Sequence, residues 1–71
     1  MGYPNKRYEQ LADQLQTQIR DQVYPVGSRL PGVRKLGEQH GVSVATVVSA
    51  CRELEQRGVL EARPRSGFFV C

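Results

Sequence analysis

The sequence contains no tryptophan, one histidine and only two cysteines, and these shortages exclude several classes of protein. Cys51 and Cys71 lie too far apart for the C-x-x-C spacing of a structural zinc site, and two cysteines are too few for a secreted disulfide scaffold. We therefore expect a reducing, cytoplasmic setting. No apolar run approaches the roughly eighteen residues of a membrane span, and no charged-then-apolar leader opens the chain, so we expect no membrane partner.

The length of 71 residues permits one small domain, residues 1–71, and excludes most enzymes. His40 has no catalytic or metal-binding constellation around it, and we interpret it as a turn or core-edge residue. Cys51 is expected to be a small core residue rather than a reactive thiol. The sequence therefore predicts that the chain is not an enzyme and holds no metal or cofactor.

The net charge of +3 is unevenly distributed along the chain. Residues 1–28 contain three basic and three acidic side chains, whereas residues 29–71 contain seven basic and four acidic ones. A basic surplus of this kind suits a polyanionic partner, but it is also common on ordinary solvated surfaces. The pattern of residues has to decide between the two.

Apolar residues at spacings of three and four predict three helices. The first covers about 6–22, with an apolar stripe from Tyr8 to Val23. The second follows Pro31 and ends at Gly41, and the third covers about 44–57, with Ser43 as its N-cap.

Two apolar stretches, 59–63 and 68–70, predict an antiparallel hairpin around the four-residue turn 64–67, which has a basic tip. Between the first two helices, Pro and Gly punctuation leaves residues 29–30 as a short extended piece.

The second and third helices have the residues that a steeply crossed helix-turn-helix needs. Gly37 leaves room where the helices cross, Gly41 supplies a positive φ in the turn, and Val42 and Val47 fill the angle. Together with the basic hairpin, these features predict a winged helix-turn-helix, mainly α with a small antiparallel wing of two or three strands. The helix-turn-helix would cover about 32–57 and the wing about 59–70.

Four segments of the chain carry a family resemblance, namely RYEQL (7–11), GSRLPGVRKL (27–36), GVSVATV (41–47) and LEQRGVL (54–60). Together they resemble the amino-terminal DNA-binding domain of GntR-type bacterial transcription regulators. The stretches SVATVV (43–48) and RPRSGFFV (63–70) look most like the MocR-type branch. That resemblance implies duplex DNA as the partner and, in full-length MocR-type members, a following aminotransferase-like domain that binds pyridoxal phosphate.

The chain departs from the family pattern at three positions. Gly32 stands where the family usually has a capping Ser or Thr, so only its backbone N–H is available to a phosphate. Val44 and Val48 stand where arginines often read guanine, which excludes arginine-to-guanine recognition from these two sites.

A helical wheel places Ala45, Ser49 and Arg52 on the outward face of the third helix and Val44, Thr46 and Val48 on its flanks. Small side chains of this kind fit a major groove, where methyl groups meet thymine and hydroxyls reach base edges. The two valines would serve either the groove or the packing around the helix. Basic residues before and within the second helix would hold phosphates, and the hairpin tip would lie in or beside the minor groove. The predicted DNA-binding residues are Arg7, Tyr8, Arg29, Arg34, Ser43, Val44, Ala45, Thr46, Ser49, Arg63, Arg65, Ser66 and Gly67.

Two other functions stay open at this point. A winged helix also serves as a protein-protein interaction module, which Val44 and Val48 would favour. Alternatively, the chain is the DNA-binding appendage of a pyridoxal-phosphate protein, although neither Lys6 nor Lys35 is placed to hold the cofactor here. An effector or oligomerisation domain, and with it any homodimer contact, would lie beyond this chain.

Overall fold

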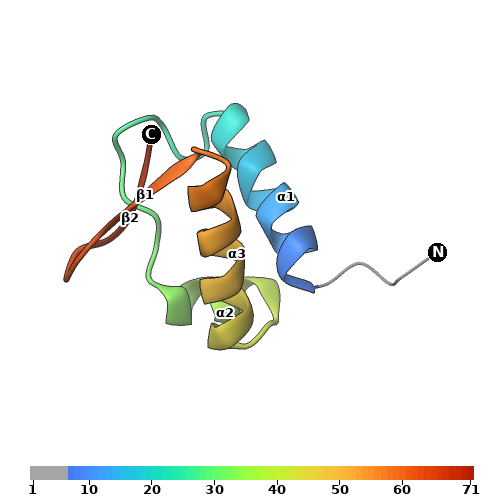
Figure 1. The fold of residues 1–71 in the computed structure, drawn as a ribbon. Helices are drawn as coiled ribbons and strands as arrows, with labels where there is room; N and C mark the ends of the chain where they lie inside the picture. Colours follow the sequence, from blue (N-terminus) through green and yellow to red (C-terminus); the bar gives the residue numbers. More distant parts are fainter. Residues whose placement is uncertain (1–6) are drawn as a thin grey trace.

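The computed structural model describes residues 7–71 and contains three helices followed by a two-stranded antiparallel wing (Figure 1). The helices are α1 (Arg7–Arg20), α2 (Val33–His40) and α3 (Val44–Gln56), and the strands are β1 (Leu60–Arg63) and β2 (Gly67–Val70). The predicted winged helix-turn-helix is confirmed. In Figure 1, α1 lies beside α3, and the wing extends from the opposite side of α3.

The core lies where α1 and α3 pack against each other and against α2 and the base of the wing. Its fully buried side chains come from every element, and the connection between α1 and α2 adds one leucine. These residues are Leu11, Ala12, Leu15, Leu30, Leu36, Val47, Ala50, Cys51, Leu54, Leu60 and Val70. Burial of this apolar set, at about 25 cal/mol per Å², is the main stabilising term of the fold.

The first helix is shorter than its apolar pattern predicted. It ends at Arg20, and Gln22 adopts a left-handed conformation with φ 65° that turns the chain away. Val23 is consequently 58% exposed, so its assignment to the core stripe was wrong. Lys6, the predicted first residue, lies outside the described residues.

The turn between α2 and α3 has the predicted chemistry. Gly41 lies in the left-handed region with φ 68°, and the Val42 N–H donates to the Gly37 carbonyl at 3.0 Å. A Cβ built on Gly37 would lie 2.8 Å from the Val42 carbonyl oxygen and 3.7 Å from Val47 Cγ2. The space that Gly37 leaves is therefore used by the turn itself more than by α3.

The wing differs from the prediction in the length of its loop. Strand β2 begins at Gly67, which pairs with Arg63, so the connecting loop has three residues, 64–66, instead of four. Strand β2 also has a second neighbour, because residues 27–30 exchange hydrogen bonds with it and Arg29 forms a bridge with Phe69. This pairing joins the wing to the segment that leads into α2.

Candidate nucleic-acid interface

The start of α3 is held by its N-cap. Ser43 has extended backbone angles, and its hydroxyl oxygen accepts a hydrogen bond from the Thr46 N–H at 3.2 Å. The two hydroxyl oxygens, Ser43 Oγ and Thr46 Oγ1, lie 3.0 Å apart and share a second hydrogen bond. The cap satisfies one of the orphan N–H groups at the helix start, and it fixes the Thr46 hydroxyl beside Ser43.

The two sides of α3 are as the helical wheel predicted. Val47, Ala50, Cys51 and Leu54 are fully buried, whereas Ala45, Ser49 and Arg52 are exposed. Val44 is 44% exposed and therefore does not serve mainly as packing, while Val48 and Thr46 are partly buried on the flanks. The outward face of α3 thus carries small side chains along the first two turns of the helix.

The start of α2 has no side-chain cap, because Gly32 stands at the N-cap position with φ −60° and ψ 156°. Arg34 and Lys35 follow in the first turn and are exposed. Within residues 7–71 Arg34 has neither a hydrogen-bond partner nor an ion-pair partner. Its charge is free for an external anion, at a helix terminus whose backbone dipole also favours one.

The two arginines of the wing have different surroundings. Arg65 is at the loop tip, exposed and in a left-handed conformation with φ 67°, with Ser66 beside it. Arg63 instead lies over the Phe69 ring, 4.2 Å from the centroid, and its Nη2 is 3.4 Å from Glu61 Oε1. Arg65 therefore lies in the loop and makes no ion pair within residues 7–71, whereas Arg63 is held against the sheet.

The other predicted wing residue, Gly67, lies in β2 and not in the loop. A Cβ at this position would come within 3.3 Å of the Arg29 Nε, so the guanidinium of Arg29 rests beside the Gly67 backbone. Arg29 is exposed and, within the described chain, makes no ion pair.

The two predicted residues of α1 start that helix. Arg7 is exposed and Tyr8 is partly buried against the core. Arg7 lines a surface hollow of about 250 Å³ between α1 and the helix-turn-helix turn. The other lining residues include Gln10 and Gln14 of α1 and His40 at the end of α2. His40 is partly buried, as expected for a core-edge residue.

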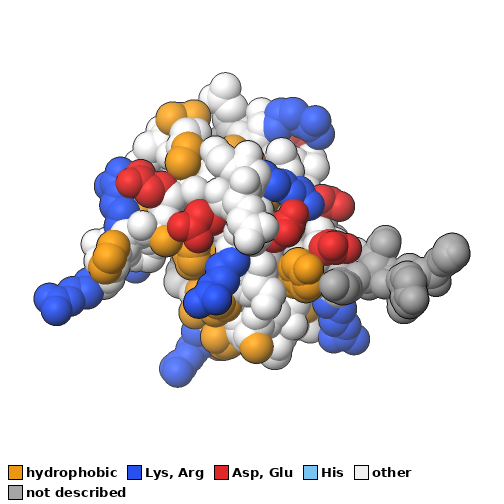
Figure 2. All heavy atoms as spheres, in the orientation of Figure 1, with side chains coloured by type: hydrophobic (Ala, Val, Ile, Leu, Met, Phe, Trp, Pro, Cys, Tyr) orange, Lys and Arg blue, Asp and Glu red, His pale blue; other side chains and the backbone are white. Residues whose placement is uncertain are grey.

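Acidic side chains are unevenly distributed over the face in view. Figure 2 shows the acidic side chains gathered across the middle of the visible face. The lower edge, where Figure 1 places α2 and the start of α3, shows basic and hydrophobic side chains instead. Such a surface attracts polyanions to the edge that carries the helix-turn-helix.

Other kinds of site find little support among residues 7–71. No group of three or more His, Cys, Asp or Glu side chains there is placed to hold a metal ion. No helix in the same range is long and apolar enough to cross a bilayer. Burial raises the pKa of the Cys51 thiol to about 11, which keeps it protonated and unreactive near neutral pH.

The family model described as "Bacterial regulatory proteins, gntR family" matches residues 7–70. The "Uncharacterized HTH-type transcriptional regulator YjiR" of Escherichia coli (strain K12) is 44% identical over 64 residues, which are 90% of this chain and 14% of that protein. This chain thus spans a small part of that relative's length.

Two solved structures are also similar. "Streptococcus agalactiae GntR" is 40% identical with a TM-score of 0.80, over 89% of this chain and 30% of that one. "Crystal Structure of AraR(DBD) in complex with operator ORX1" is 25% identical with a TM-score of 0.89, over 96% of this chain and 82% of that one.

Proposed function

This chain belongs to the GntR family of bacterial regulatory proteins, and on that premise we propose that it binds duplex DNA with α3 in the major groove. The observation that carries the proposal is the outward face of α3, which is small and exposed and is flanked by arginines without ion-pair partners among residues 7–71. The AraR domain, which has the same fold, was crystallised with an operator. The chain is a DNA-binding domain and not a catalytic one.

The small face of α3 determines what kind of sequence preference is expected. Ala45 and Val44 present methyl groups that fit the C5-methyl of thymine, and Ser49 presents a hydroxyl to a base edge. No long donor stands at positions 44 or 48 to make bidentate contacts with guanine. We therefore expect a shallow preference for thymine-rich positions.

Basic side chains on either side of α3 would position the duplex. Arg34, with the backbone N–H groups at the start of α2, is assigned to a phosphate, and Arg29 lies on the approach to the same helix. Arg65 at the tip of the wing is assigned to the adjacent minor groove or its edge. Arg63, held by Phe69 and Glu61, would support the wing more than the contact itself.

The proposal is tested by measuring affinity for a fluorescent duplex at several salt concentrations. Phosphate contacts release counterions, so affinity falls as salt rises. Arg34→Ala and Arg65→Ala should each reduce the salt slope by about one, whereas Arg20→Ala, at the far end of α1, should leave it unchanged. A flat salt response of the wild-type chain, or no binding at low salt, would favour the protein-interaction module instead.

Base recognition is tested separately by selecting sites from random duplexes. Thr46→Ala removes a methyl and a hydroxyl from the first turn of α3, and we expect it to reduce discrimination by about 1–3 kcal/mol at most. If the selected sites are dominated by guanines that are still recognised after changes at Ala45, Thr46 and Ser49, α3 does not read the bases as proposed.

We also propose that the longer protein is of the MocR type, on the strength of the segments 43–48 and 63–70. Such a protein would carry a pyridoxal-phosphate domain after this one and would form any homodimer there. Within this chain Lys35 is exposed on α2, so it offers no deep pocket for the cofactor, and Lys6 lies outside the described residues. The characteristic visible absorbance of pyridoxal phosphate in the full-length protein is the test.

A further inference from the structure

Arg52 is an exposed cation on α3 to which nothing above assigns a role. It continues the outward row of Ala45 and Ser49, at positions i, i+4 and i+7 of the helix. Within residues 7–71 it has no hydrogen-bond or ion-pair partner. Its charge is therefore not compensated inside the described domain.

The side chain borders a shallow surface hollow where the start of α1 lies against α3. The lining residues are Tyr8, Ser49, Arg52, Glu53 and Gln56. The hydroxyl of Ser49, the guanidinium of Arg52 and the amide of Gln56 thus border one position on the surface, and each of these groups is able to donate a hydrogen bond to an anion.

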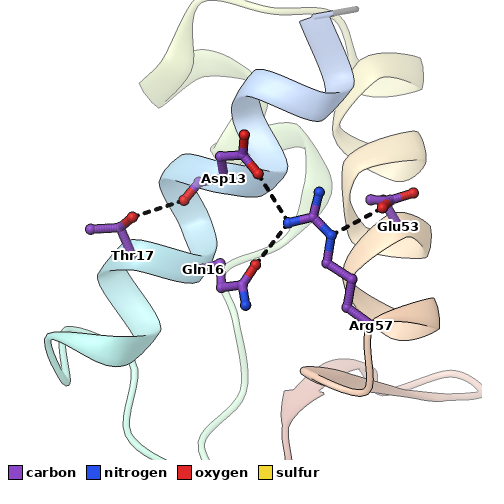
Figure 3. Close-up of polar contacts among 5 residues, drawn as sticks. All are labelled: Asp13, Gln16, Thr17, Glu53 and Arg57. Atoms are coloured by element: carbon purple, nitrogen blue, oxygen red, sulfur yellow. Dashed lines mark hydrogen bonds and ion pairs between the residues drawn. The ribbon is translucent and has the colours of Figure 1, made fainter.

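Glu53 is the acidic residue in this lining, and it is already paired. Its Oε2 accepts a hydrogen bond from Arg57 Nε at 3.0 Å, and Figure 3 shows Glu53 directed toward Arg57. Arg57 in turn donates to Asp13 of α1 at 3.0 Å. Glu53 is thus directed toward Arg57, and within residues 7–71 it forms no ion pair with Arg52, whose guanidinium stays available to an external anion.

The spacing along α3 determines where Arg52 would lie on a bound duplex. Arg52 is seven residues beyond Ala45, which corresponds to about 10 Å along the helix axis. The major groove is about 8.5 Å deep and about 12 Å wide, so a helix that inserts its first turns brings a residue this far along to the rim. The rim is lined by phosphates, which arginine binds with charge-assisted hydrogen bonds.

We infer that Arg52 binds a backbone phosphate at the rim of the major groove, on the strand that faces the start of α1, with Tyr8 beside it. This inference rests on the proposed function, because it takes α3 to be the helix in the groove. Arg52 acts as a positioning residue that fixes the rotation of α3 and reads no base.

The experiment compares Arg52→Gln with Arg20→Gln, which removes the same charge from the exposed end of α1, at the end of the molecule opposite to the start of α3 (Figure 1). Affinity for thymine-rich and guanine-rich duplexes is measured by fluorescence anisotropy at several salt concentrations. Arg52→Gln should weaken binding to both duplexes by a similar factor and reduce the salt slope by about one, and Arg20→Gln should not. Far-UV circular dichroism checks that both variants are folded.

A second measurement locates the contact. Single phosphates on the strand facing α1 are replaced by neutral methylphosphonates, and we expect one replacement to weaken the wild type while weakening Arg52→Gln no further. If Arg52→Gln keeps the wild-type slope while Arg34→Ala lowers it, the inference is wrong and the proposed function stands. If the wild type binds no duplex at low salt, the proposed function fails first.

Discussion

Arg57 joins α1 to the end of α3, and its removal is the sharpest test of how the domain is held together. Its Nη1 lies 3.0 Å from Asp13 Oδ1 and 2.7 Å from Gln16 Oε1, and its Nε lies 3.0 Å from Glu53 Oε2 (Figure 3). Hydrogen bonds to Asp13 and Glu53 raise the pKa of the guanidinium, so Arg57 is a cation near neutral pH.

The stability lost on removing Arg57 is limited because its ion-pair partners are partly exposed to solvent. The Asp13 side chain is 70% exposed and that of Arg57 is 30% exposed, so their ion pair belongs at the low end of the range for surface pairs, about 0.3 kcal/mol. The i, i+4 pair with Glu53 adds about 0.4 kcal/mol. The hydrogen bond to Gln16 contributes about 0.5 kcal/mol, and the aliphatic stem covers some apolar surface. We expect Arg57→Ala to lower the free energy of unfolding by about 1–1.5 kcal/mol.

The assay is urea unfolding followed by far-UV circular dichroism, at about 0.1 M and 1 M NaCl. High salt screens the two ion pairs and should remove about half of the difference from wild type. Arg57→Lys keeps the charge but lacks the planar fork, so it should restore less than half of the loss. Arg20→Ala is the matched control and should stay within about 0.5 kcal/mol of wild type.

Two results would refute the reasoning about Arg57. If Arg57→Ala stays within about 0.3 kcal/mol of wild type at both salt concentrations, α1 is held by the apolar core alone. If a double-mutant cycle with Asp13→Ala gives no coupling free energy, the contact between Arg57 and Asp13 does not contribute to stability.

Three further predictions concern the caps and the buried thiol. Ser43→Ala removes the N-cap of α3 and should lower the free energy of unfolding by about 1 kcal/mol, whereas Thr46→Ala should change it by less than about 0.5 kcal/mol. Equal effects of the two variants in urea unfolding would contradict the cap assignment. Gly41→Ala places a side chain at φ 68° and should cost about 1–2 kcal/mol in the same assay, and Gly41→Asn should cost less because asparagine tolerates this region. Burial raises the pKa of the Cys51 thiol from 9.0 to about 11. Above pH 9 the unfolded state therefore releases a proton that the folded state retains. The free energy of unfolding then falls by up to about 1.4 kcal/mol per pH unit until about pH 11. Cys51→Ala should lack that part of the decline, and at pH 8 a maleimide should modify the exposed Cys71 but not Cys51 in the folded chain.

Local chemistry in the sequence was sufficient to predict the helix-turn-helix and its caps. The spacing of apolar residues identified the buried side of α3, because a helix repeats every 3.6 residues whatever it packs against. Gly41 and Ser43 predicted the turn and the cap for a similar reason, since both act within three or four residues of their own position. The family resemblance then placed the DNA contacts, and these assignments stay predictions.

Only the tertiary structure decided the contacts between residues that are distant in sequence. Arg57 meets Asp13 across 44 positions, and no periodicity in the chain indicates that pair. The pairing of residues 27–30 with β2 and the position of Arg63 over Phe69 depend on how the wing is set against α3. The helical wheel turned Arg52 outward, but the hollow that it shares with Tyr8 exists only because α1 packs beside α3. Long-range contacts of this kind depend on the angles and distances between elements, which a local pattern does not specify.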